Sequence, residues 1–112
     1  MRNEESKSES AKALERVVLA QGDQDYVLRL FVSGASPKST AAIRNIKRIC
    51  AEHLPGRCDL RVFDIYQQPR LAAVEQVVAA PMLVKQAPLP LRRLIGDLSD
   101  TKLVLQRLGV LS

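Results

Sequence analysis

Two cysteines, Cys50 and Cys58, are the residues of this sequence best suited to chemistry. Reactive dithiol pairs have the spacing Cys-x-x-Cys and lie at a helix N-terminus, where the helix dipole lowers the thiol pKa. Here the cysteines are eight positions apart, and the expected strand-to-helix loop at residues 33–39 contains no cysteine. We therefore expect two reduced structural thiols. A thiol oxidoreductase that uses Cys50 or Cys58 is the alternative from the class of enzymes.

The other nucleophiles, bases and carboxylates do not form a catalytic arrangement. His53 is the single histidine, and its place near the end of an expected helix favours a capping or solvent-facing role. Ser36 is explained as a helix N-cap, and Asp97 and Asp100 flank a turn of the kind that aspartates favour. The sequence contains no phosphate-loop or dinucleotide-binding motif. We therefore expect no enzyme activity, metal or cofactor, and a protein that works by binding another protein.

These residues belong to one domain, which we expect over residues 26–112. Residues 1–25 are expected to form an extension that is a short helix or partly disordered. No apolar run approaches the roughly 20 residues that span a bilayer, and the charged N-terminus does not resemble a secretory signal. The cytoplasm is therefore the expected compartment.

The first half of this domain has clear element signals. The β-rich run Tyr26–Val32 is followed by a helix that begins at Pro37, and then by a second strand over Leu60–Ile65. Ser36 precedes the helix as its N-cap, and an apolar stripe repeats along it at helical spacing. Strand, helix and strand in this order predict a parallel βαβ unit with a right-handed crossover.

The second half has weaker signals. We expect a short helix over Arg70–Val77, a strand over Ala80–Lys85, a strand or helix over Leu91–Ile95, and a final helix over Thr101–Leu108. The order βαβ-α-β-β-α is that of a thioredoxin-like α/β fold. In that fold a proline just before the third strand is typically cis, and Pro81 occupies this position.

The charge of the chain is unevenly distributed. Residues 26–112 contain thirteen Lys or Arg against six Asp or Glu, a net charge of +7, within a total of +5. A basic domain attracts acidic partners. Arg44, Lys47 and Arg48 fall on one expected helix flank without the aromatic residues that stack on bases. Protein is therefore favoured over nucleic acid as the partner, and a basic nucleic-acid-binding module remains an alternative.

Several segments make the sequence resemble the KaiB family of circadian-clock proteins over Tyr26 to Leu111. The segments are YVLRLFVSGASPKSTAAIRNIKRI, LRVFDIYQQPRLA, AAPMLVKQAPLPLRRLIGDLSD and VLQRLGVL. The resemblance implies a non-enzymatic regulator that binds a KaiC-type hexameric ATPase, with a KaiA-like protein or a sensor kinase as further partners. It also implies a homo-oligomer, a dimer or tetramer, and a timing or related stress output.

The family resemblance further implies a metamorphic chain whose C-terminal half adopts two arrangements. Residues 78–95, where strand and helix signals are of similar strength, lie in the half that switches. From charge and expected exposure, we predict Lys38, Arg44 and Arg61 as partner contacts. The candidates for the switch or for cis-proline bonds are Pro81, Pro88, Pro90, Gly96 and Asp97.

Overall fold

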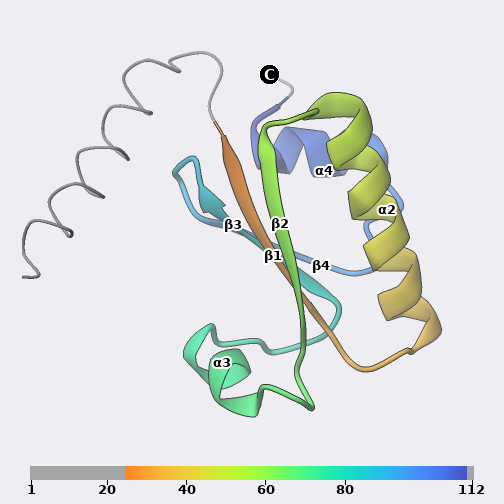
Figure 1. The fold of residues 1–112 in the computed structure, drawn as a ribbon, viewed down its shortest axis with the longest axis vertical. Coiled ribbons are helices and arrows are strands. Elements are labelled where there is room, and N and C mark those ends of the chain that lie inside the picture. The colour runs from red at the N-terminus through yellow and green to blue at the C-terminus, as the bar shows by residue number, and fades with distance from the viewer. Residues whose placement is uncertain (1–24, 111–112) are drawn as a thin grey trace, which may run out of the picture.

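The computed structural model describes residues 25–110, so the expected N-terminal extension lies outside the described residues, apart from its last residue. The described chain forms a four-stranded sheet with three helices (Figure 1). The strands are β1 (Tyr26–Val32), β2 (Cys58–Asp64), β3 (Met82–Ala87) and β4 (Arg92–Ile95). The helices are α2 (Pro37–His53), α3 (Pro69–Val74) and α4 (Thr101–Leu108).

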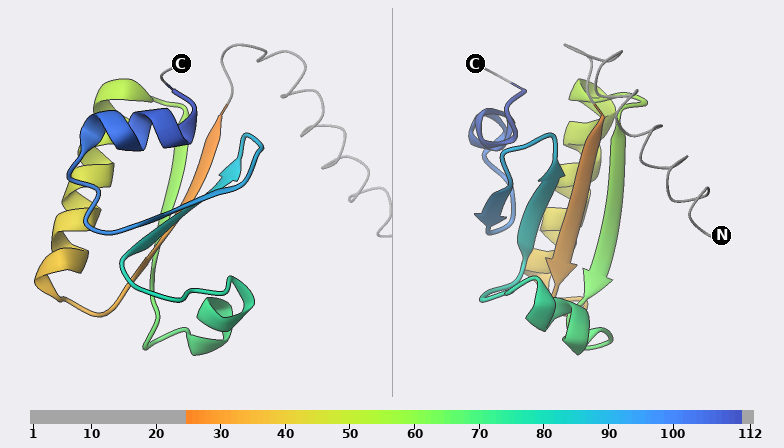
Figure 2. Two further views of the ribbon diagram at one scale, coloured as in Figure 1. Left: turned by 180° about the vertical axis from the view of Figure 1, so that it is seen from behind. Right: turned by 90° about the vertical axis from the view of Figure 1, so that its left-hand side faces the viewer.

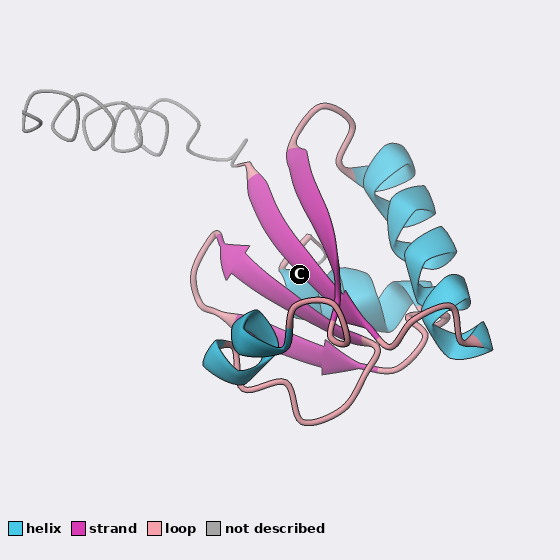
Figure 3. Ribbon diagram, turned by 60° about the horizontal axis from the view of Figure 1, so that its bottom comes forward, coloured by secondary structure: helices cyan, strands magenta, loops and turns pink. Residues whose placement is uncertain are grey.

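The sheet has the strand order β2-β1-β3-β4, with β2 and β4 at its edges. β1 and β2 are parallel, which confirms the βαβ unit, and β3 runs antiparallel to both β1 and β4. α2 and α4 lie on one face of the sheet, and α3 lies near the end of the other face (Figures 2 and 3). This is the expected thioredoxin-like arrangement.

Two apolar clusters hold these layers together, because alternate residues of a strand point to opposite faces. Leu28 and Leu30 of β1 pack under Ile46 of α2 and Leu105 of α4, and all four are almost fully buried. On the other face Phe31, Met82 and Val84 form a smaller cluster, against which Leu71 of α3 packs. The rings of Phe31 and Phe63 are stacked there, with centroids 5.6 Å apart.

The helix ends follow the local signals in the sequence. Ser36 Oγ accepts a hydrogen bond from the backbone N–H of Ser39 at 3.3 Å, and Pro37 occupies the first turn of α2. Asp100 Oδ1 accepts from the N–H of Leu103 at 3.1 Å, so it is the N-cap of α4. Gly109 ends α4 with φ of 83°, a conformation that glycine adopts readily.

Several element boundaries differ from the expected ones. β2 spans Cys58–Asp64, where Leu60–Ile65 was expected. α3 ends at Val74, before the expected Val77, since the backbone turns to a φ of 58° at Gln76. β3 begins after Pro81, because proline has no N–H for the ladder, and continues to Ala87. The segment Leu91–Ile95, which we expected to be a strand or a helix, contains the strand β4.

Candidate protein-docking surface

The loop between β1 and α2 occupies the place where a dithiol pair would lie in this fold. Instead, three serines bond to the loop and to one another. The buried Ser39 Oγ accepts from the backbone N–H of Ser33 at 3.0 Å, and Ser36 Oγ caps α2. His53, the single histidine of the sequence, lies at the opposite end of α2. The loop is therefore a hydrogen-bonded helix start.

The predicted contacts Lys38 and Arg44 are both exposed on α2. Lys38 lies in the first turn, close enough to Asp97 to affect the pKa of that carboxyl. Arg44 lies on the outer flank with Lys47 and Arg48, all exposed, which confirms the expected basic helix flank. Arg48 also reaches α4, where its Nη2 donates to Thr101 Oγ1 at 3.1 Å.

Arg61 lies on the other side of the sheet. It alternates along β2 with Leu60, which packs toward α2, and shares the face of Phe63, which packs toward α3. Arg61 is highly exposed, and its Nε lies 3.6 Å from Asp59 Oδ1. The structure therefore does not bring Arg61 together with Lys38 and Arg44. The sheet lies between the two positions, so a single flat partner surface cannot contact both.

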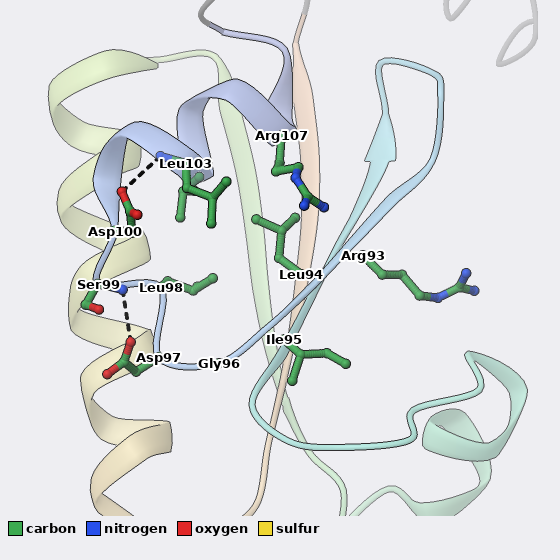
Figure 4. A pocket seen from close by; sticks show the side chains of 11 residues that line it. Arg93, Leu94, Ile95, Gly96, Asp97, Leu98, Ser99, Asp100, Leu103 and Arg107 are labelled. Atoms are coloured by element: carbon green, nitrogen blue, oxygen red, sulfur yellow. Dashed lines mark hydrogen bonds between the residues drawn. The ribbon is translucent and has the colours of Figure 1, made fainter.

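The loop from β4 to α4 contains two of the predicted switch residues, Gly96 and Asp97 (Figure 4). Asp97 Oδ1 accepts from the N–H of Ser99 at 3.0 Å, and hydrogen bonds from Ser99 lower the pKa of Asp97. Asn45 of α2 donates to the Asp97 carbonyl at 2.8 Å. A cavity of about 340 Å³ lies between this loop, β4 and α4. Asp97 and Asp100 thus have the expected turn and cap roles, whereas a switching role stays a prediction.

The three remaining switch candidates are prolines at the two ends of β3. The peptide bonds that precede Pro81, Pro88 and Pro90 are all cis, which confirms the expectation for Pro81. Pro81 is buried, and its carbonyl accepts from the N–H of Gly96 at 3.0 Å, which joins the start of β3 to the end of β4.

The structure brings together two cysteines that are eight positions apart in the sequence. Cys50, at the end of α2, and Cys58, the first residue of β2, have their Sγ atoms 2.8 Å apart, and both are free thiols. A hydrogen bond from the Cys50 thiol lowers the pKa of Cys58, and the same contact, together with burial, raises that of Cys50. The apolar stripe of α2 predicted that Cys50 faces the sheet, whereas its contact with Cys58 depends on where β2 begins beside the helix.

Comparison with known proteins assigns the chain to a family. The KaiB domain model matches residues 29–110. The chain belongs to the KaiB family. Over 84 residues it is 44% identical to the circadian clock protein KaiB3 of Synechocystis, which covers 75% of this chain and 82% of that protein. It is 42% identical to the circadian clock oscillator protein KaiB of Synechococcus elongatus, over 77% of this chain and 84% of that protein.

Solved structures support the fold that this KaiB-family chain adopts. The N-terminal domain of Synechococcus elongatus SasA matches with a TM-score of 0.63 and 30% identity, over 80% of this chain and 88% of that one. Mitochondrial thioredoxin 3 of Saccharomyces cerevisiae matches with a TM-score of 0.63 at 15% identity, over 88% and 89% of the two chains. The likeness to thioredoxin 3 concerns the fold alone.

All the predicted contacts and switch residues lie within the region matched by the KaiB model. Within residues 25–110 no helix is long and apolar enough to cross a membrane. The same described residues contain no group of three or more His, Cys, Asp or Glu side chains that could hold a metal ion.

Proposed function

We propose that this protein is a non-enzymatic circadian-clock regulator that docks on a KaiC-type hexameric ATPase. The observation that carries the proposal is the serine-capped loop at residues 33–39, which occupies the redox position of the fold in a chain of the KaiB family. The named relatives are circadian clock proteins, which supports a timing role. A related stress output is compatible with the same docking function.

The docking surface in this proposal consists of the outer flank of α2 and the edge of β2. β2 is an edge strand, so its outer backbone groups are available to a partner. Arg44, on the α2 side of the sheet, and Arg61, on the opposite face, are both exposed. Such a surface suits an acidic partner that wraps around β2. A KaiA-like protein or a sensor kinase would be a further partner in a complete clock.

The geometry favours docking over thiol catalysis. A catalytic thiolate is stabilised by the positive end of a helix, whereas Cys50 lies in the last turn of α2, at the negative end. Burial and the contact with Cys58 also raise the pKa of Cys50. The pair therefore differs from a turnover-competent dithiol in its position on the helix.

In this proposal the protein is cytoplasmic, self-associates as a dimer or tetramer, and rearranges its C-terminal half to bind. Two arrangements of one chain must lie within a few kcal/mol of each other. Within that half β4 has modest anchoring, since only Leu94 of its four residues is buried. Val78 and Leu89 are 82% and 80% exposed, and apolar surface of this kind can be covered by another copy or another packing.

Gel filtration of the purified chain, alone and with its cognate KaiC homologue and ATP, tests the proposal. The chain alone should elute as a dimer or tetramer, and the mixture should contain a co-eluting complex after a day. Charge reversal by Arg44→Glu or Arg61→Glu should weaken the complex about tenfold, because each introduces repulsion at the interface. Arg70→Glu, at an exposed position on α3, is the matched control and should have little effect.

Absence of co-elution by the wild-type chain would contradict the docking proposal. A complex that Arg44→Glu weakens and Arg61→Glu leaves unchanged would confine the interface to the α2 side of the sheet. Binding to DNA in place of the ATPase, with affinity that falls steeply with salt, would favour the nucleic-acid alternative.

A further inference from the structure

The contact between Cys50 and Cys58 has no role in the proposed docking function. Their Sγ atoms are 2.8 Å apart, and both side chains are partly exposed at the edge of the main apolar cluster. These are the two cysteines of the entire sequence. Two thiols at this separation are placed to react with each other once one of them is oxidised.

The backbone around the pair keeps the two sulfurs close. The N–H of Leu54 donates to the Cys50 carbonyl at 2.9 Å, and the N–H of Arg57 donates to the Leu54 carbonyl at 3.0 Å. The Arg57 carbonyl in turn accepts from the N–H of Tyr26 at 2.7 Å, which joins the turn to the sheet. The turn between α2 and β2 is thus fixed at both ends, and the thiols need no large movement to meet.

We propose that Cys50 and Cys58 form a reversible intramolecular disulfide that joins the end of α2 to the start of β2. The oxidant is a low-molecular-weight disulfide such as oxidised glutathione. The modification occurs once per chain and changes the protein itself, so it requires no turnover of a substrate.

The reaction has two exchange steps. The Cys58 thiolate attacks one sulfur of oxidised glutathione, which forms a Cys58–glutathione disulfide and releases one glutathione thiolate. Cys50 then loses its proton and attacks Cys58 Sγ, which forms the protein disulfide and releases the second glutathione. The two cysteines together lose two electrons and two protons, and both are recovered in two molecules of reduced glutathione.

The two thiols have different roles in this sequence of steps. The pKa of Cys58 is lowered by the hydrogen bond from Cys50, so Cys58 provides the first thiolate. Cys50 has a raised pKa and stays protonated until the mixed disulfide is next to it. The assignment matches the general rule that the more ionised thiol attacks first.

Mass spectrometry of the full chain, equilibrated at increasing ratios of oxidised to reduced glutathione, tests this inference. We expect the loss of two hydrogen atoms per chain, with no covalent link between chains, and full recovery after treatment with dithiothreitol. The transition should follow a two-electron couple, with a tenfold change in the equilibrium for about 30 mV. The oxidised protein should melt about 5 °C or more above the reduced protein, because the disulfide restricts the unfolded chain.

Two serine variants serve as controls. Cys50→Ser should retain one glutathione on Cys58, because the resolving thiol has been removed. Cys50→Ser/Cys58→Ser should show no change in mass or melting temperature with the glutathione ratio. Independent glutathione adducts on both cysteines, disulfide-linked dimers, or unchanged thiols under oxidising conditions would overturn the proposal. The wild-type result alone is decisive if either variant fails to fold, since a monomer with two cysteines can form only this internal disulfide.

Discussion

At the scale of single residues, Lys85 has a position that is unusual for its type. Lysine is almost never fully buried unless it has a partner, yet Lys85 is 3% exposed in the middle of β3. Its Nζ donates to the carbonyl of Leu108 at 3.1 Å, at the end of α4. This cation thus satisfies a helix carbonyl and interacts favourably with the negative end of the α4 dipole.

The environment of Lys85 predicts a change of stability at high pH. Burial lowers its pKa below the ordinary value of 10.5, and Arg92 lowers it further. The folded state therefore releases the proton at a lower pH than the unfolded state. Between the lowered pKa and 10.5, the free energy of unfolding should rise with pH, because the cost of burying the charge disappears.

Urea denaturation of the wild type and of Lys85→Met at pH 7, 8, 9 and 10 measures this effect. The variant is the reference, since its other titrating groups are the same. The wild type should gain stability relative to Lys85→Met as the pH rises over this range. A relative loss of stability would show that the folded protein favours the charged lysine.

Residue-scale features were predictable where the cause is local. The caps Ser36 and Asp100 were both predicted from residue type and position, and each makes its expected hydrogen bond. The burial of Lys85 depends on the packing of β3 against α4, which comes later in the sequence. The contact of Cys50 with Cys58 depends on β2, which begins beside the end of α2. No local pattern contains that information.

At the scale of elements, α3 is the helix with the weakest attachment to the fold. It has six residues, none of them buried, and it packs on the sheet mainly through Leu71. Glu75, directly after it, provides a polar attachment. Its Oε2 accepts from Arg29 Nη1 at 3.2 Å and from Gln86 Nε2 at 3.3 Å, on β1 and β3 respectively.

Glu75→Ala should therefore loosen α3 locally. We expect faster amide hydrogen exchange over residues 69–77, while the free energy of unfolding falls by only about 0.5–1 kcal/mol, since the ion pair is partly exposed. Hydrogen-exchange mass spectrometry measures the first quantity and urea denaturation the second. Glu52→Ala is the matched control, because Glu52 pairs with Arg48 on the exposed side of α2. Equal exchange in the two variants would contradict the attachment role.

Elements with a strong pattern of apolar residues could be predicted from the sequence. Elements that depend on pairing with another strand were harder to predict. The apolar stripe of α2 and the β-rich run of β1 predicted both elements at nearly their observed bounds. β4 could not be assigned from Leu91–Ile95 alone, because its strand state depends on pairing with β3. α4, in the same half of the chain, was predicted at its observed bounds, because its cap and its helical pattern are local.

At the scale of the whole molecule, exposed arginines lie on both faces of the sheet whose β2 edge we propose for docking. Residues 26–112 have a net charge of +7, and Arg44 and Arg61 lie on opposite sides of β2. The sequence predicted the charge and the exposure of these residues. It could not predict their separation by the sheet, since that depends on which face of β2 packs toward α2.

This distribution of charge predicts that association with the proposed ATPase partner depends on salt. Exposed charges interact over about 10 Å at 0.1 M salt and about 3 Å at 1 M, so long-range attraction is lost as salt rises. The association rate should therefore fall about tenfold between 50 and 500 mM NaCl, while the dissociation rate changes less. Surface plasmon resonance with the immobilised ATPase measures both rates.

The Arg44→Glu and Arg61→Glu variants show whether the dependence comes from the docking edge. Each should associate more slowly at 50 mM NaCl and approach the wild-type rate at 500 mM, because salt screens the repulsion that the glutamate introduces. Arg70→Glu on α3 should follow the wild-type curve, apart from a small effect of net charge. If all three variants shift equally, attraction arises from the total charge of the molecule and the β2 edge has no special role. If none shifts, the partner recognises the shape and backbone of this edge, and the charges serve only solubility.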